Sequence, residues 1–438
     1  MQLTFIFNFT YGRGIVVLRA CPLLVALLLA AGPARADGLG DFELSGYGEL
    51  GFAFLDHAAD RNREGGALDD RRLEFDTTRL VLELEQELPG DLEIEAEVEF
   101  EHGGTGATRE IEYEEFGEFE TEVEKGGEVI VEELYIQKSF GRVDAKVGRF
   151  YVAFGRLSDY FRPIDYLGVA RSEAETLVTP GQWDEMGGSV TVHLPRVTLT
   201  GQLVNGLDST GFSSERWVAS GHQTAFETVR ASSLAAALRV DVGVVPWLDV
   251  GASGYLGGSS KNRPKPDLAA ECSDPDTDNV APCGYVSGTV SMADLHAFWR
   301  GGGVRGSAWA MWGHLENADL ISERNDRLSN TLGVDRTPVG DNAIALAAEV
   351  GYDVAPHLGV SAANRLEPYL GVDYLDTMVA SRDSLFDNPR YERTVLGVGA
   401  SYVYLDSIVA KLEWSHRRFG SSDLRPENTV RTMAGFVF

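Results

Sequence analysis

Three features are scarce in this sequence: cysteine, lysine and long apolar runs. Of its 438 residues three are cysteine and six are lysine, whereas Asp and Glu together number 67. The formal net charge of −29 argues against binding to nucleic acid and to anionic lipid surfaces, because both partners are negative. No apolar run after residue 36 reaches the length of a membrane-spanning helix, which excludes a helical membrane protein.

The first 36 residues have the pattern of a secretory signal peptide. Arg13 and Arg19 precede the apolar run ACPLLVALLLAAG, which ends in Ala34-Arg35-Ala36. A positive segment, a short apolar segment and an A-x-A cleavage site are the three parts of such a leader. We therefore expect a signal peptide over 1–36 and a single domain over 37–438, with a retained N-terminal anchor as the lesser alternative.

Removal of this leader takes Cys21 with it and leaves Cys272 and Cys283. Both lie in one polar, proline-rich segment. In an exported protein an even pair this close predicts a disulfide that closes the loop. Metal binding by two thiolates without a neighbouring histidine is the weaker alternative.

Short segments of alternating apolar and polar residues are abundant. In segment 92–100 every second residue from Leu92 to Phe100 is apolar, and the four residues between them are Glu. Such alternation is typical of a strand with one apolar face, and it has no helical interpretation at this length. A soluble sheet would turn the acidic row to bulk water, whereas a transmembrane barrel would turn it to the lumen.

Pairs of segments with alternating apolar and polar residues recur as far as the C-terminus, and the connections between them are alternately short turns and long loops. We count about sixteen strands, with loops of about 10–35 residues at one end, as in closed outer-membrane barrels. Closure leaves no strand edge unpaired in hydrocarbon. We predict an all-β transmembrane antiparallel β-barrel with short periplasmic turns and long extracellular loops. A soluble β-sandwich array is the main competitor, but it would not alternate short and long connections so regularly.

Aromatic residues and the C-terminus also favour a barrel. Several aromatic residues lie near segment ends, where a barrel places the aromatic girdles at the two membrane interfaces. They are Trp299, Trp312, Tyr352, Tyr374, Tyr402, Tyr404 and Trp414. The last segment ends on Phe438, and such a terminal Phe resembles the signal that outer-membrane barrels present to the barrel assembly machinery.

The run EELYIQKSFGRVDAKVGRFYVAFGRLSDY resembles the corresponding hairpin of the phosphate-selective porin O/P family. Members typically carry VGRF-x-x-x-FG there, and this chain has Val147-Gly148-Arg149-Phe150 followed by Phe154-Gly155. The match covers about thirty residues, and the remainder agrees only in the rhythm of strands and loops. The resemblance implies a sixteen-stranded outer-membrane porin, usually a homotrimer. It also implies an inward-folded loop, here about 153–185, that narrows the pore.

Phosphate selectivity in that family depends on basic residues in the lumen, and here the sequence departs from the family. We expect a porin for passive diffusion of small hydrophilic solutes or ions, weakly cation-preferring or unselective. An anion- or phosphate-selective porin is one alternative, and a non-conducting structural or adhesin barrel is another. The expected location is the outer membrane of a Gram-negative bacterium, in contact with lipid and lipopolysaccharide.

Alternation and the resemblance together give candidate pore-lining residues. Opposed charges at a constriction would create a transverse field that selects among solutes. The strand candidates are Arg79, Glu83, Glu133, Asp144, Lys146, Arg239, Arg305, Glu349, Asp373, Lys411, Glu413 and Arg431. The candidates in the inward loop are Arg156, Asp159, Arg162, Asp165 and Arg171. A one-residue bulge reverses such assignments downstream, and the phase of Arg149 is not determined.

Segment 109–128 contains nine Glu and alternates partly around Gly117. This pattern predicts a hairpin above the membrane, either a solvated loop or a latch onto a neighbouring subunit. Cation binding is the alternative, since carboxylates are hard oxygen ligands, but the ordered spacing of a calcium loop is lacking.

Nothing in the sequence indicates catalysis, a metal centre or a cofactor. Ser415 and His416 are adjacent on one predicted strand and point to opposite faces, so they cannot act as nucleophile and base. The eight histidines show no metal-ligand spacing, and the glycine pairs lie at turns rather than between a strand and a helix.

Overall fold

The computed structural model describes residues 42–57, 70–103, 107–115, 118–125, 128–158, 161–222, 231–262, 286–327, 334, 336–379 and 387–438. The predicted signal peptide, Asp159 and the predicted disulfide between Cys272 and Cys283 lie outside these residues. Among the helices in this part of the chain, none is long and apolar enough to cross a membrane.

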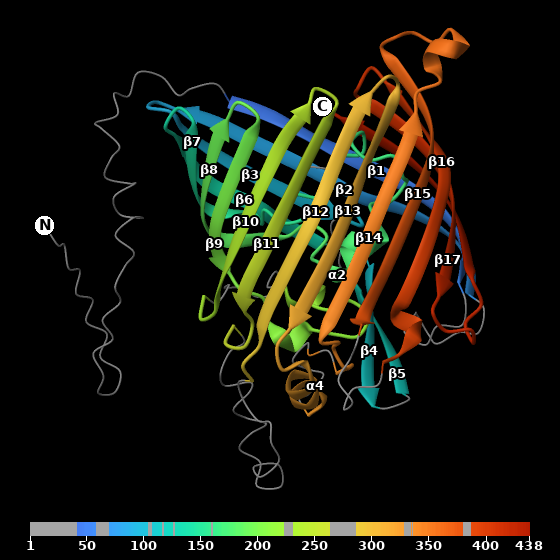
Figure 1. Ribbon diagram of the computed structural model, residues 1–438. Coiled ribbons are helices and arrows are strands. Elements are labelled where there is room, and N and C mark those ends of the chain that lie inside the picture. Colours follow the sequence, from blue (N-terminus) through green and yellow to red (C-terminus); the bar gives the residue numbers. More distant parts are fainter. Residues whose placement is uncertain are drawn as a thin grey trace, which may run out of the picture.

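Sixteen strands form a closed antiparallel barrel, which is the predicted fold class (Figure 1). The barrel strands are β1 (Phe42–His57), β2 (Asp70–Leu88), β3 (Leu92–Glu101), β6 (Glu128–Ser139), β7 (Val143–Tyr151), β8 (Asp184–Leu194), β9 (Val197–Asn205), β10 (Leu234–Val245), β11 (Leu248–Gly258), β12 (Thr289–Gly301), β13 (Val304–Leu315), β14 (Asn342–Tyr352), β15 (Asn364–Val379), β16 (Glu392–Tyr404), β17 (Ile408–Phe419) and β18 (Glu427–Val437). Pairing of β1 with β18 closes the barrel, and Gly46 and Phe438 exchange backbone hydrogen bonds of 3.1 and 3.0 Å.

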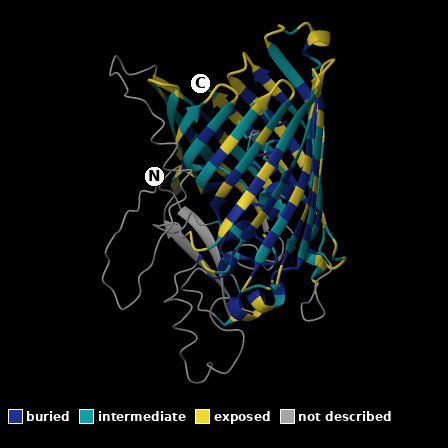
Figure 2. Cartoon of the chain, turned by 60° about the vertical axis from the view of Figure 1, so that its left-hand side comes forward, coloured by how far each residue is buried: buried dark blue, intermediate teal, exposed yellow. Residues whose placement is uncertain are grey.

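Alternation along the strands sets which face meets lipid. In β6 the side chains of Leu134 and Ile136 are 54% and 42% exposed, whereas the intervening Tyr135 is 6% exposed. Trp312, Tyr352, Tyr402, Tyr404 and Trp414 of the predicted aromatic girdles are also exposed. Figure 2 shows exposed residues distributed over the outer surface of the wall. The wall therefore has an apolar exterior, as a membrane-spanning barrel requires.

Short turns and long connections occupy opposite ends of the barrel (Figure 1). At the turn between β2 and β3, Gly90 and Asp91 have φ of 88° and 57°, the left-handed region that glycine and aspartate tolerate. The short-turn end also carries η6 (Ala355–Leu358).

The long connections carry α2 (Glu173–Val178), η2 (Ser209–Gly211), η3 (Ala219–Gly221), α4 (Ala318–Asp326) and η7 (Pro389–Tyr391). The predicted acidic hairpin forms a separate two-stranded sheet of β4 (Ala107–Glu115) and β5 (Glu118–Lys125).

The barrel encloses an apolar core along part of its wall. Inward residues of β10 to β15 belong to one buried apolar cluster, including Ala237, Tyr255, Met292, Trp309, Met311, Ala345 and Leu375. Phe154, Val178 and Trp183 from the β7–β8 connection join it, as do Phe212 and Trp217 from the β9–β10 connection. Apolar side chains on these strands are explained by contact with folded loops rather than with water.

Candidate functional site

Residues 152–158 and 161–183, between β7 and β8, belong to a folded connection that we call the β7–β8 loop. Its polar contacts reach inward side chains on β1, β10, β13, β15 and β17, which span more than half of the circumference. A segment that contacts opposite sides of a closed barrel must cross its interior. The sequence placed such a loop at about 153–185, but Asp184 and Glu185 belong to β8.

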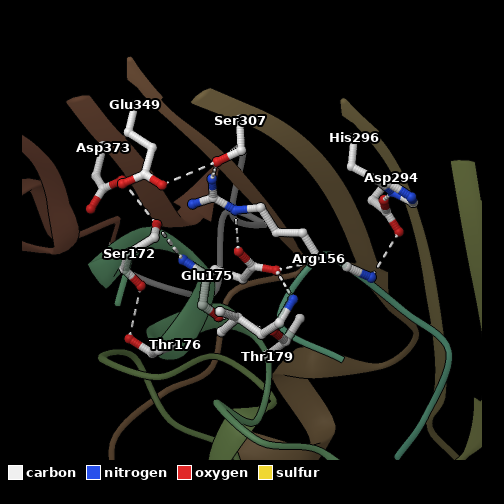
Figure 3. A network of polar contacts seen from close by, with 12 residues as sticks. Arg156, Ser172, Glu175, Thr176, Thr179, Asp294, His296, Ser307, Glu349 and Asp373 are labelled. Atoms are coloured by element: carbon white, nitrogen blue, oxygen red, sulfur yellow. Dashed lines mark hydrogen bonds and ion pairs between the residues drawn. The ribbon is translucent and has the colours of Figure 1, made fainter. Parts of the chain in front are cut away.

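The loop is first held at Gly155 and Arg156. The Gly155 N–H donates to Asp294 Oδ2 at 3.1 Å, and Arg239 Nη1 donates to the Gly155 carbonyl at 3.0 Å. Glu175 in α2 accepts from the Arg156 backbone N–H at 2.8 Å and from its Nε at 2.7 Å. Figure 3 shows this guanidinium between Glu175 and Ser307 of β13. Gly155 has φ of +73°, and a Cβ there would lie 2.8 Å from Glu175 Oε1, so glycine is required.

A second set of contacts holds the middle of the loop through its carbonyl groups. Arg305 Nη1 donates to the Ile164 and Asp165 carbonyls at 2.9 and 2.7 Å, and its Nη2 pairs with Glu367 at 2.7 Å. Lys411 Nζ donates to the carbonyls of Tyr166 and Gly168, at 2.7 and 2.9 Å. These cations provide the hydrogen bonds that the loop carbonyl groups would otherwise accept from water.

Carboxylates of the wall hold the N–H groups of the loop. Glu349 accepts from Leu167 N–H at 3.1 Å, and Glu413 accepts from Val169 N–H at 3.2 Å. Asp373 accepts from Ser172 Oγ and from Glu173 N–H, both at 2.9 Å, at the N-terminus of α2 (Figure 3). Negative charge at this end of a helix is favourable because its first N–H groups are unpaired.

Several predicted pore-lining residues therefore face the interior but hold the loop. Arg239 and Arg305 pair with Asp241 and Glu367, and Lys411 donates to two loop carbonyls, so these cations are engaged in contacts within the protein. The sequence contained no signal for these contacts, because they join residues up to 245 positions apart.

Acidic side chains dominate the inner face of β1, β2, β3 and β6, which we call the acidic face. In register across β2, β3 and β6 lie Glu83, Glu97 and Glu133, and Glu85 lies opposite Glu95. Like charges directly opposite each other on neighbouring strands repel. The predicted candidate Arg79 is a counter-ion here, 3.0 Å from Glu99 and 3.6 Å from Glu49.

The acidic face includes Glu132, which sequence analysis missed. A β-bulge opposite Glu97 and Val98 turns both Glu132 and Glu133 inward, where they are 4% and 7% exposed. Glu132 accepts from the Tyr151 hydroxyl at 2.8 Å and from Gln182 Nε2 at 2.7 Å.

The remaining predicted candidates are spread along the interior. Asp144 lies 2.9 Å from His193, and Lys146 Nζ lies 3.5 Å from the ring centroid of Tyr135. Arg431 lies 4.0 Å from Glu413, beside a cleft of about 80 Å³ that the loop and β14 to β18 line.

Three further candidates belong to the loop itself. Arg162 pairs with Asp165 at 2.9 Å, and this hydrogen bond raises the pKa of the guanidinium. Arg171 donates to Gln182 and, at 3.1 Å, to the Phe161 carbonyl.

Ser415 and His416 occupy opposite faces of β17. Ser415 is 7% exposed on the inner face, whereas the His416 ring stacks on Trp414 with 5.9 Å between ring centroids. The two side chains are therefore not arranged as a nucleophile and its base.

Comparisons with known proteins identify the fold. No protein-family model matches the chain, and no curated protein matches it. The outer-membrane channel DcaP of Acinetobacter baumannii matches with a TM-score of 0.53 and 16% identity over 93% of this chain and 100% of that chain. OprB of Pseudomonas putida matches with a TM-score of 0.53 and 10% identity, covering 91% and 94% of the two chains. The anion-selective porin from Comamonas acidovorans matches with a TM-score of 0.51 and 10% identity, covering 91% and 99%.

The chain therefore has a porin-type barrel, and its structural neighbours are outer-membrane porins and channels. None of these matches identifies the phosphate-selective porin O/P family in particular.

Proposed function

We propose that this chain is an outer-membrane porin that lets small hydrophilic solutes and ions diffuse passively, with a weak preference for cations. The observation that carries the proposal is the unequal use of charge in the interior. Three wall cations, Arg239, Arg305 and Lys411, hold the β7–β8 loop, whereas the acidic face places rows of carboxylates beside one another.

Electrostatics gives this asymmetry a direction. Carboxylates that line an aqueous passage concentrate cations and exclude anions, and the low-dielectric barrel wall focuses their field. Arg79 offsets part of the negative charge at the acidic face. Partial compensation of this kind supports a weak preference rather than a strict one.

The β7–β8 loop is the proposed constriction. Its contacts with both sides of the barrel leave solutes only the space between the loop and the wall. We further propose that residues 1–36 are a cleaved signal peptide, that the mature chain forms a homotrimer among outer-membrane lipid and lipopolysaccharide, and that Phe438 is read by the barrel assembly machinery.

An anion- or phosphate-selective porin is the second candidate. It is favoured by the family resemblance of the hairpin over 132–160 and by Arg431, which is about one-third exposed beside the cleft. A non-conducting structural barrel is the third candidate, and the apolar core that fills part of the interior favours it.

Swelling of liposomes that contain the purified protein distinguishes the three candidates. The solutes are a neutral sugar, a small cation and a small anion of similar size, and an added ionophore carries the counter-ion of each salt so that charge balance does not block entry. We expect the sugar and the cation to enter faster than the anion. Faster entry of the anion supports the second candidate, and no swelling with folded barrel supports the third.

A further inference from the structure

A polar network lies behind the loop on the inner wall of β10, β11 and β12. His296 of β12 contacts Asp294 of the same strand, with Nδ1 2.7 Å from Oδ1. The same ring contacts Asp241 of β10, with Nε2 2.9 Å from Oδ1. The ring crosses β11 at Gly251, where a Cβ would lie only 2.2 Å from Nε2. Glycine therefore permits a bridge between two strands that are not neighbours in the barrel.

Both carboxylates of this bridge are linked to the β7–β8 loop. Asp294 Oδ2 accepts from the Gly155 N–H at 3.1 Å. Asp241 accepts from Arg239 Nε and Nη2 at 2.8 and 3.1 Å, and Arg239 Nη1 donates to the Gly155 carbonyl at 3.0 Å. The Gly155 residue is therefore held at its N–H and at its carbonyl, and His296 joins the two groups that hold it.

The arrangement requires an additional proton. A neutral imidazole has one N–H and one lone pair, whereas both ring nitrogens here face a carboxylate oxygen. Without the proton, one of the two contacts would set a lone pair against a carboxylate. Both contacts form as hydrogen bonds only when the ring, Asp294 and Asp241 together carry one proton more than a neutral imidazole between two ionised carboxylates.

The charged groups around the ring stabilise its protonated form, because two carboxylates and only one guanidinium face it. The charged groups that face it are Asp241 and Arg239 from β10 and Asp294 from β12. In register on β11 and β13 lie Gly251 and Trp309, which are uncharged, and Asp249 lies two positions along β11. The nearby charges of Arg156 in the loop and Arg305 in β13 are paired with Glu175 and Glu367.

We propose that His296 is a positioning residue for the β7–β8 loop and that its proton makes the anchor at Gly155 depend on pH. As the pH rises and the proton leaves, the ring can donate a hydrogen bond to only one of its two carboxylates. The hydrogen bonds of Gly155 with Asp294 and Arg239 then weaken. Because the anchored state binds the additional proton, linkage requires that a rise in pH disfavours it. This inference concerns loop anchoring and does not depend on the chain being a channel.

Hydrogen exchange of the full-length protein in lipid tests the proposal directly. Peptides that cover 152–158 are followed from about pH 6 to about pH 10, with the intrinsic base-catalysed rate divided out. We expect protection to fall about tenfold over this range, which corresponds to about 1.4 kcal/mol in the free energy of local opening. The fall should follow the titration curve of a single proton.

Three variants separate the proton from the packing. In Asp241→Asn a neutral ring donates from Nδ1 to Asp294 and accepts at Nε2 from the new amide, so protection should no longer change with pH, although its level falls because Arg239 Nη2 loses the oxygen that it shares with the ring. His296→Gln should also lose the pH transition. The matched control is His314→Gln, because that ring faces an amide, Asn342, at 3.0 Å, and it should keep the wild-type transition.

Protection that does not change with pH in the wild type would overturn the proposal, as would a transition that survives in His296→Gln or Asp241→Asn. Absence of ion conduction by the same preparation would count against the porin function and leave this inference intact, so the two failures are distinguishable.

Discussion

Glu132 and Glu133 are consecutive in β6, yet both side chains face the barrel interior because of the bulge opposite Glu97. The sequence carried a signal for this bulge. Val129 and Val131 are exposed at odd positions, whereas Leu134 and Ile136 are exposed at even positions, so the apolar phase shifts by one residue between them. A search for such phase shifts would have placed Glu132 on the acidic face.

Glu132→Gln should reduce the cation preference as much as Glu133→Gln does, because both substitutions remove one carboxylate from the acidic face. Strict alternation would point Glu132 to lipid and predicts no effect. Reversal potentials of the two variants measure this. Glu323→Gln is the matched control, since Glu323 is half-exposed in α4 and pairs with Arg327. An unchanged reversal potential in Glu132→Gln alone would show that its side chain does not reach the passage.

Glu175→Gln should loosen the loop without unfolding the barrel. Glu175 accepts from the backbone N–H groups of Arg156 and Leu157 and pairs with the buried Arg156 guanidinium. Removal of one partner of a buried ion pair costs about 3 kcal/mol, because the other charge is left uncompensated. We expect noisier open-channel current and faster exchange of amides 152–158. Unchanged current noise and unchanged amide exchange would mean that the other contacts are enough to hold the loop in place.

At the scale of elements, the strands could be predicted from the sequence, but the loop contacts could not. Period-2 alternation gave the hairpins and their lipid-facing residues, because a strand in a membrane must show that pattern. Helix α2 was missed although Ser172 and Glu175 have the spacing of a helix N-terminus, and Ser172 Oγ accepts from Glu175 N–H at 3.3 Å. The partners of Arg239, Arg305 and Lys411 depend on tertiary structure alone.

Replacement of residues 157–181 by a short flexible linker should widen the passage. The strand ladder of the barrel is complete without this segment, so the variant should still fold, although the apolar core loses Val178 and Ala174. We expect the unit conductance to rise about twofold or more, because the constriction sets the resistance of a pore. Conductance recordings of variant and wild type in the same salt measure it. An unchanged conductance would place the narrowest part of the passage elsewhere.

At the scale of the whole molecule, the barrel was predictable because its rhythm is redundant. Sixteen strands and alternating connection lengths both indicated the same closed sheet, so no single misplaced residue could change the result. The interior was less predictable. Inward apolar residues such as Trp309 and Met311 are explained only by the loops that cover them.

The cation preference should weaken as salt concentration rises. The Debye length falls from about 10 Å at 0.1 M to about 3 Å at 1 M, so the field of the acidic face reaches less of the passage. Reversal potentials at a fixed concentration ratio but different absolute concentrations measure this effect. A preference independent of salt would indicate selection by size or by a dehydrated binding site instead.

The most direct test of the account is the reversal potential of single channels of the wild-type protein in a planar bilayer under a potassium chloride gradient. We expect ohmic steps and a reversal potential on the side of the potassium equilibrium potential. A reversal potential on the chloride side would contradict it, because the cations that hold the β7–β8 loop would then still govern the passage.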